Sequence, residues 1–436
     1  MWGAHWTINL EKRGVPAVYV VDEPFQADVQ ITCEKEGMPL LRRVVVPHPC
    51  GDVPDEELPT IAAKLIEGLN LPLTQDEKFP RAEKLEKLPR IVFKGTLGEV
   101  NQFFYEKGWS DGLPIIPPTE EAVQEMLKGT GHPPDEIVTT NMLPESLTVS
   151  VENVATVGVM AGCEPEYMPV LLGIIEAFSK DLFSSTVRST CSFSFAVFVN
   201  GPVAHQIGMN SGINALGSST GNKANATIGR FLRLAIICLG GSRSGLNDMS
   251  SIGNPSKYSF AFSENEQRSP WEPFHVSSGY RLDESVVSIM SGGFSHSGPF
   301  GHLSLDRIAR RIAAYELPNG VLIVMDPMSA KRLSREGYTK QAAQEYIWSH
   351  AASTLAEFRD DDFFYPAFIE PWLKQKTGPG AQPSWPSHYL DLPAHEIVQV
   401  YPRGQVRIVV VGGETNPFTQ VWQMARPSSV AIDKWR

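Results

Sequence analysis

Short apolar runs alternate along the chain with longer stretches in which apolar residues recur at helical spacing. The apolar runs predict buried strands at residues 15–21, 43–46, 193–199, 321–325 and 406–411. The helical spacing predicts helices at residues 5–13, 24–37, 55–68, 97–107, 151–160, 166–178, 225–239, 304–315 and 339–356. Because strands that alternate with helices are typical of α/β proteins, we expect an α/β fold.

The predicted elements fall into two regions. Residues 1–74 are expected to form an incomplete, Rossmann-like βαβ domain, because this segment opens with a helix where a βαβ domain opens with a strand. Residues 75–92 hold many Lys and Glu residues and two prolines, which predicts a linker. Residues 93–436 are expected to form a larger α/β domain around a mostly buried sheet, with residues 371–393 as a proline-rich surface excursion.

Charge and cysteine usage narrow the class of protein. The formal net charge of −11 and the lack of a basic stripe argue against nucleic acid as a partner. No apolar run approaches the length of about 18 residues that a membrane span needs, so no membrane partner is expected. The five cysteines are odd in number and unpatterned, which favours a reducing, cytoplasmic location over a disulfide framework.

Asparagine and glycine crowd into residues 200–271. Asn carries donors and an acceptor, and Gly allows the backbone to approach a ligand, so this block predicts a binding site for a polar small molecule or an anion. The alternative is a series of tight turns, in which the same residues are common. The substrate-binding candidates are Asn200, Gly201, Asn225, Thr227, Arg230 and Asn265.

The candidates for catalysis are one thiol and three carboxylates. Cys163 precedes a predicted helix, where the helix N-terminus lowers the pKa of a thiol and favours a nucleophile. The alternative is a small, buried and inert residue. Asp111, Asp248 and Glu264 lie in or beside loops and are candidates for acid–base or metal-binding groups. His296 and His302 are weaker candidates for metal ligands, and the cofactor stays open, with a divalent metal as the candidate.

Several short segments, taken in order along the chain, resemble the UGSC-motif (seleno)protein family. They are Leu10-Glu11-Lys12-Arg13-Gly14-Val15-Pro16-Ala17-Val18, Asp111-Gly112-Leu113-Pro114 with Pro117-Pro118-Thr119, Met160-Ala161-Gly162-Cys163-Glu164-Pro165-Glu166-Tyr167, Asn200-Gly201-Pro202, Asn225-Ala226-Thr227-Ile228-Gly229-Arg230 and Glu264-Asn265-Glu266. The resemblance implies redox or nucleophilic chemistry by a Sec/Cys-Gly-Ser-Cys motif ahead of the first helix. Here Gly3-Ala4-His5 stands in that place, and no cysteine precedes Cys33. Asp326-Pro327-Met328 also departs from the family, in which a Glu-His pair follows the proline.

The missing motif leaves two expectations: a truncated chain, or a chain that works through its second domain. Our hypothesis is an enzyme that acts on a small polar molecule in that domain, as a thiol- or metal-assisted lyase, hydrolase or reductase. One alternative is a catalytically silent subunit that pairs with an active chain carrying the thiol or selenol. The other is a small-molecule binding protein. We expect a homo-oligomer or a complex with a paralogous subunit.

Overall fold

The computed structural model describes residues 2–79, 89–180, 183–297, 304–314, 320–360, 370 and 387–436. The chain forms two compact units. Unit 1 comprises Met1–Phe103 with the short segments Val187–Thr190 and Ser242–Ser250, and unit 2 comprises Phe104–Thr186, Cys191–Gly241 and Ser251–Arg436. Each unit is described by itself below.

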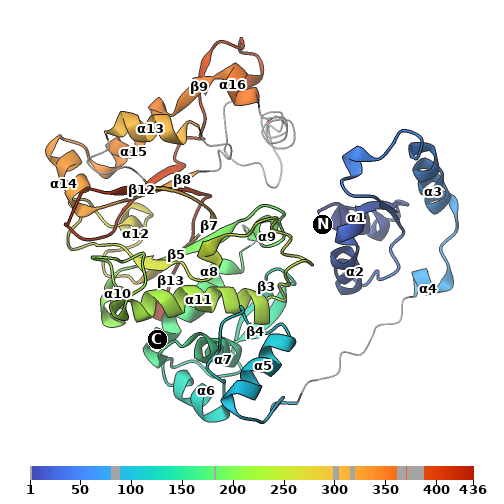
Figure 1. The fold of residues 1–436 in the computed structure, drawn as a ribbon, viewed down its shortest axis with the longest axis horizontal. Helices are drawn as coiled ribbons and strands as arrows, with labels where there is room; N and C mark the ends of the chain where they lie inside the picture. Colours follow the sequence, from blue (N-terminus) through green and yellow to red (C-terminus); the bar gives the residue numbers. More distant parts are fainter. Residues whose placement is uncertain are drawn as a thin grey trace. The chain divides into compact units, whose positions relative to one another are not determined.

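Unit 1 is built around two parallel strands, β1 (Tyr19–Asp22) and β2 (Arg43–Val46), joined through helix α2 (Gln26–Lys35). Its other helices are α1 (Trp2–Lys12), α3 (Leu58–Asn70) and α4 (Gln75–Lys78) (Figure 1). Apolar side chains of α1, β1 and α2 pack together with Leu41 in one small core: Ala4, Ile8, Val21, Val29, Cys33 and Leu41. The βαβ arrangement expected from the sequence is therefore present.

Two local expectations in unit 1 need correction, namely the strand at 15–21 and the linker at 75–92. The strand predicted at 15–21 begins only at Tyr19, because Pro16 has no N–H group to donate to a neighbouring strand. Helix α3 has helical spacing but no buried residue. It is tied down instead by Arg42, whose guanidinium donates to the carbonyls of Gly68 and Leu71. Part of the predicted linker forms α4, and residues 80–88 lie outside the described residues.

Unit 2 contains a mixed seven-stranded sheet. The strand order is β11-β8-β12-β7-β5-β6, with β13 also paired to β7. The strands are β5 (Ser194–Asn200), β6 (Ala261–Ser263), β7 (Val286–Ser297), β8 (Val321–Met325), β11 (Val406–Val410), β12 (Thr419–Met424) and β13 (Ser428–Ala431). Only the β5–β6 and β11–β8 pairs are parallel. Two short antiparallel pairs lie outside this sheet: β3 (Ile137–Met142) with β4 (Leu147–Ser150), and β9 (Ala352–Thr354) with β10 (Ile397–Gln399).

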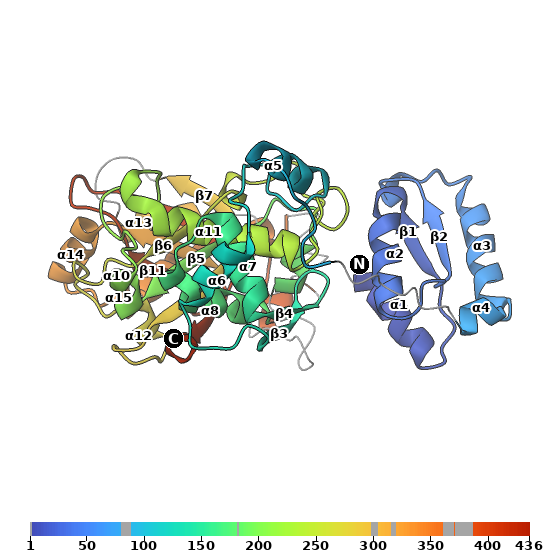
Figure 2. The same cartoon turned by 90° about the horizontal axis from the view of Figure 1, so that it is seen from below.

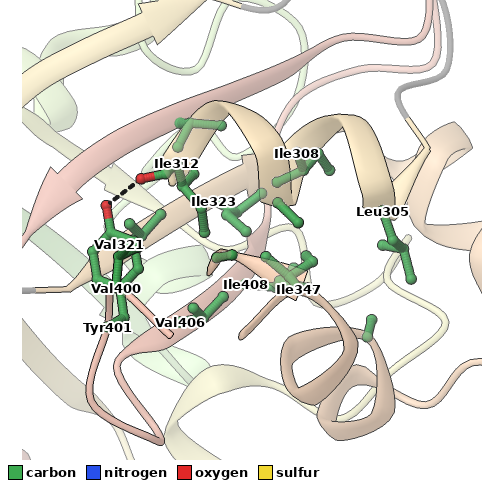
Figure 3. Close-up of a cluster of buried hydrophobic side chains, with 14 of the residues drawn as sticks. Leu305, Ile308, Ile312, Val321, Ile323, Ile347, Val400, Tyr401, Val406 and Ile408 are labelled. Atoms are coloured by element: carbon green, nitrogen blue, oxygen red, sulfur yellow. Dashed lines mark hydrogen bonds between the residues drawn. The ribbon is translucent and has the colours of Figure 1, made fainter. Parts of the chain in front are cut away.

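Helices cover the sheet in two groups. In the first group, α8 (Met168–Phe178) packs on β7 and β13, and α11 (Lys223–Cys238) packs on β6. Helix α7 (Val151–Ala161) packs against both of these helices, and α6 (Glu120–Leu127) packs against α7 (Figure 2). The second group covers β8 and β11 and comprises α13 (Leu305–Ile312), α14 (Pro327–Arg335) and α15 (Lys340–His350). Figure 3 shows this second core, where the buried Tyr401 hydroxyl donates to the Ile312 carbonyl at 2.8 Å.

The remaining short helices lie between these elements. They are α5 (Leu97–Glu106), in which the boundary between the units falls, α9 (Ser184–Val187), α10 (Pro202–Gln206), α12 (Phe274–Ser277) and α16 (Leu355–Arg359). Among the described helices, none combines the length and the apolar character that a membrane crossing requires.

The sheet of unit 2 is strongly curved. Side chains from six of its strands meet in one buried cluster, including Phe198 of β5, Phe262 of β6 and Val409 of β11. Strands β6 and β11 stand at opposite ends of the strand order, and yet the Asn265 amide donates to the Val410 carbonyl at 2.7 Å. The curvature therefore brings the carboxyl ends of β6 and β11 together.

The α/β class predicted from the sequence is confirmed, but the end of one predicted helix is a strand. The helix expected at 339–356 ends at His350, and residues 352–354 form β9, because they pair with β10. Residues 371–386 of the predicted surface excursion lie outside the described residues.

Candidate functional site

Strand register places two polar side chains at one edge of the sheet in unit 2. Strands β5 and β6 run parallel, and Val199 lies opposite Ser263. Asn200 and Glu264 therefore follow at the same edge, where the carboxyl ends of parallel strands meet. Gly201 then turns the chain with a φ of 82°, and a Cβ atom there would lie 2.1 Å from the Glu284 carbonyl oxygen, so only glycine fits.

Glu264 is a buried carboxylate surrounded by donors. One oxygen, Oε2, accepts from Asn200 Nδ2 at 2.7 Å and from the Phe274 amide at 2.6 Å. The other, Oε1, lies 3.4 Å from Lys340 Nζ and 3.5 Å from the Val410 amide. The Glu264 side chain is 0% exposed and that of Lys340 is 4% exposed. Burial of two charges costs several kcal/mol each unless they pair and bond in this way.

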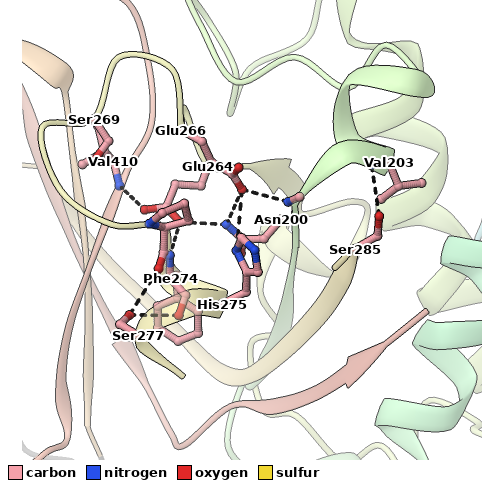
Figure 4. Close-up of polar contacts among 12 residues, drawn as sticks. Asn200, Val203, Glu264, Glu266, Ser269, Phe274, His275, Ser277, Ser285 and Val410 are labelled. Atoms are coloured by element: carbon pink, nitrogen blue, oxygen red, sulfur yellow. Dashed lines mark hydrogen bonds and ion pairs between the residues drawn. The ribbon is translucent and has the colours of Figure 1, made fainter. Parts of the chain in front are cut away.

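A second carboxylate and a histidine lie beside this pair (Figure 4). Glu266 Oε1 accepts from Asn200 Nδ2 at 2.9 Å and from the Gly201 amide at 2.8 Å, and it lies 3.8 Å from His275 Nδ1. His275 is completely buried, and within the described part of the chain neither of its ring nitrogens has a hydrogen-bond partner. The Asn200 Oδ1 atom is likewise without one. Buried polar atoms without a hydrogen-bond partner are rare in protein interiors, so their grouping here indicates a candidate functional site.

We call Asn200, Glu264, Glu266, His275 and Lys340 the polar centre. A cavity of about 890 Å³ adjoins it. Lys340 and Phe274 both line this cavity and both contact Glu264. The buried carboxylate therefore contacts two residues that line the cavity.

The candidates predicted from the sequence fall into separate groups. Asn200, Gly201 and Glu264 belong to the polar centre or touch it, and Asn265 Nδ2 donates beside it to the Gly412 carbonyl. Asn225 lies in the first turn of α11, which begins two residues earlier than predicted. Its side-chain amide bonds the backbone of Asn210 and Ala215, as in the tight-turn alternative.

Asp111 and Arg230 form an ion pair away from the polar centre. Arg230 Nε donates to Asp111 Oδ2 at 2.8 Å, and a terminal nitrogen donates to Oδ1 at 2.9 Å. The Asp111 side chain is 2% exposed. Arg230 also donates to the Leu113 and Pro114 carbonyls. The pair therefore fastens the Asp111 loop to α11.

The expected lowering of the Cys163 pKa is wrong. Burial raises the pKa of this thiol to about 12, although a hydrogen bond with Thr227 acts in the opposite direction. Thr227 itself donates to the Lys223 carbonyl. Cys163 also precedes α8 by several residues, so the thiol is not in the first turn of that helix. A thiol that holds its proton at neutral pH is a poor nucleophile.

The remaining candidates add no group to the polar centre. Asp248 belongs to unit 1, where it accepts from the Ser250 hydroxyl at 2.8 Å. His302 lies outside the described residues, and His296 stands on β7 opposite Val421 of β12. Among the described residues, no three His, Cys, Asp or Glu side chains are grouped as metal ligands.

Sequence reasoning missed His275 and Lys340, and it left Glu266 out of the site. Glu266 could have been found from the sequence, because it belongs to the same Glu264-Asn265-Glu266 segment as two of the candidates. Lys340 had none, because a lysine after a capping threonine is ordinary at a helix start. His275 stands in the short helix α12, eleven residues after Glu264, and only folding brings the two together.

Comparison with known proteins bears on unit 1 alone. A match to the UGSC family covers residues 2–75, which include α1, β1, α2, β2 and α3. No curated protein and no solved structure gives a significant match. The UGSC family is therefore shown for the segment 2–75, which resembles the family's model.

Proposed function

We propose that this chain is an enzyme that acts on a small polar molecule by general acid–base chemistry at the polar centre of unit 2. The observation that carries the proposal is Lys340, which lines the cavity and whose ammonium group lies 3.4 Å from the buried Glu264 carboxylate. A side chain in this position can meet a substrate and exchange a proton with a partner that solvent does not reach.

The other members of the polar centre have supporting roles in this proposal. Asn200 donates to both carboxylates and fixes their separation. Glu266 faces the His275 ring, which can carry a proton on either nitrogen. Chemistry of this kind fits a lyase or a hydrolase. A thiol-assisted reaction in unit 2 lacks support, because the pKa of Cys163 is raised.

The test is proton exchange by the purified full chain. We would incubate it in D2O with a defined panel of hydroxy, oxo and phosphorylated carboxylic acids and follow C–H signals by proton NMR. We expect exchange or conversion of at least one compound and a loss of about 10²–10⁴-fold in Lys340→Met, the range for removal of an acid–base group. Lys331→Met is the matched control, because Lys331 pairs with Glu414 away from the polar centre.

A folding defect is separated from a catalytic one by the double variant Lys340→Met/Glu264→Gln. Lys340→Met alone leaves a buried carboxylate without its cation, whereas the double variant removes both charges. We expect the double variant to recover stability and stay inactive. Full turnover by Lys340→Met would contradict the proposed role. The wild-type chain could instead bind a compound of the panel without exchanging its protons or converting it. That result would support the alternative of a small-molecule binding protein.

A further inference from the structure

The cavity beside the polar centre is lined by cationic side chains from four parts of the fold. They are Lys180 after α8, Lys340 at the start of α15, Arg407 on β11 and Arg426 between β12 and β13. The lining also holds two acidic residues, Glu272 and Glu345. Glu345 already pairs with Arg403, which is outside the lining, at 2.7 Å. We call this the basic cavity.

Arg407 and Arg426 are the least compensated of these groups. Arg407 is half-buried, and within the described part of the chain its guanidinium donates only to the carbonyl and the side-chain oxygen of Gln405, at 3.3 and 3.0 Å. Burial, and then the nearby Arg426, lower the pKa of Arg407 to about 10. Within the described residues, neither guanidinium forms a salt bridge to a carboxylate. Two such cations repel one another, and an anion between them would relieve the repulsion.

The start of α15 adds to the positive potential. Lys340 and Gln341 are the first two residues of this eleven-residue helix, and both line the basic cavity. The N-terminal end of a helix carries a partial positive charge from its aligned peptide dipoles. Lys180 adds an exposed ammonium group, which donates a long hydrogen bond of 3.2 Å to the Ser429 carbonyl. The volume of about 890 Å³ is that of a site for a metabolite.

We propose that the basic cavity binds a small molecule with at least two anionic groups, either phosphates or carboxylates. One anionic group would lie between Arg407 and Arg426, and a second would lie toward Lys340. This inference rests on the proposed function in one respect: it names the substrate class of the same site. Binding itself does not depend on turnover, and so the two can fail separately.

The experiment is titration calorimetry of the full chain with two probes, inorganic pyrophosphate and citrate, in magnesium-free buffer at about 50 and 200 mM salt. We expect at least one probe to bind, and its affinity to fall as salt rises, because the attraction is between charges. Arg407→Gln and Arg426→Gln should each weaken binding about tenfold or more. Arg332→Gln is the matched control, since Arg332 pairs with Glu336 on α14 outside the lining, and it should bind as the wild type does.

The two probes separate the sources of the anionic charge. Binding of pyrophosphate alone supports a phosphorylated ligand, and binding of citrate alone supports a polycarboxylate. The inference is overturned if neither probe binds, or if both arginine variants bind as tightly as Arg332→Gln. Arg426 is exposed, so its variant should fold even if Arg407→Gln does not. Anion binding without any proton exchange would leave this inference standing and would sink the proposed acid–base function.

Discussion

Cys163 illustrates how the surroundings of a single side chain decide its chemistry. Its sequence position, just before a predicted helix, suggests a reactive thiolate. In the structure it is buried, and desolvation outweighs the hydrogen bond with Thr227, so the pKa of the thiol is raised to about 12. The carboxylates of the polar centre are in a different environment, because several hydrogen-bond donors lie against Glu264 and Glu266.

The first prediction concerns the reactivity of this thiol. At pH 8 iodoacetamide should label the exposed Cys50 first and leave Cys163 unmodified in the native chain, because only the thiolate reacts. Peptide mapping by mass spectrometry after timed quenching measures both rates in one sample. Cys163→Ala should leave the proton-exchange activity intact, and rapid labelling of native Cys163 would contradict its raised pKa.

The pH dependence of stability follows from the same shift. The folded chain holds the Cys163 proton more tightly than the unfolded chain, in which the pKa is about 9. This contribution is complete below pH 9 and is lost as the pH rises toward 12. Urea unfolding at several pH values should show a smaller alkaline loss in Cys163→Ala.

At the scale of elements, one ion pair holds a loop of unit 2 against a helix. The bidentate Arg230–Asp111 contact joins α11 to a loop that contains glycine and prolines and has no regular structure of its own. Because Asp111 is almost completely buried, either partner left alone would be an uncompensated charge in the interior. The structure gives the two residues a shared role in holding this loop.

The second prediction is a double-mutant cycle on that pair. Asp111→Asn and Arg230→Gln should each lower the free energy of unfolding by about 3 kcal/mol, the cost of breaking a buried ion pair. The double variant should lose less than the sum of the two, since neither charge is left alone. Urea unfolding provides the measurement, and additive losses would mean that the pair does not act as a unit.

At the scale of the whole molecule, the two units have separate apolar cores. The core of unit 1 is a small cluster around Ile8 and Val29, and unit 2 holds larger clusters on its curved sheet. The family match lies entirely within unit 1, whereas the polar centre and the basic cavity lie within unit 2. The match to the family therefore does not cover these two sites.

The third prediction is that the cores respond independently to loss of volume. Ile8→Ala should lower the stability of unit 1 by about 2–5 kcal/mol, the usual cost of such a cavity. Hydrogen exchange should then increase in α1, β1 and α2 and stay unchanged in β5, β7 and β8. Ile323→Ala on β8 is the matched control and should show the reverse pattern. Equal loss of protection in both units after Ile8→Ala would mean that they unfold together.

Periodicity predicted more of the fold than of the site. The apolar runs at β5, β8 and β11 and the helical spacing of α7, α8 and α11 are local signals, and the structure contains all six elements. The long strand β7 gave no comparable signal, because its serines and glycines interrupt the apolar pattern. It nevertheless pairs with β5, β12 and β13 at the middle of the sheet.

The sequence by itself determined the α/β class, the βαβ segment and a polar block that contains Asn200 and Glu264, because each of these depends on neighbours in the chain. Only the tertiary structure decided what Glu264 meets. Lys340 lies 76 residues and Val410 146 residues further along the chain, and the curvature of the sheet brings both to one carboxylate. The same folding buries Cys163 and gathers the cations of the basic cavity from four distant segments. Charge pairing and desolvation act between atoms that are close in space, and no local pattern in the sequence records those distances.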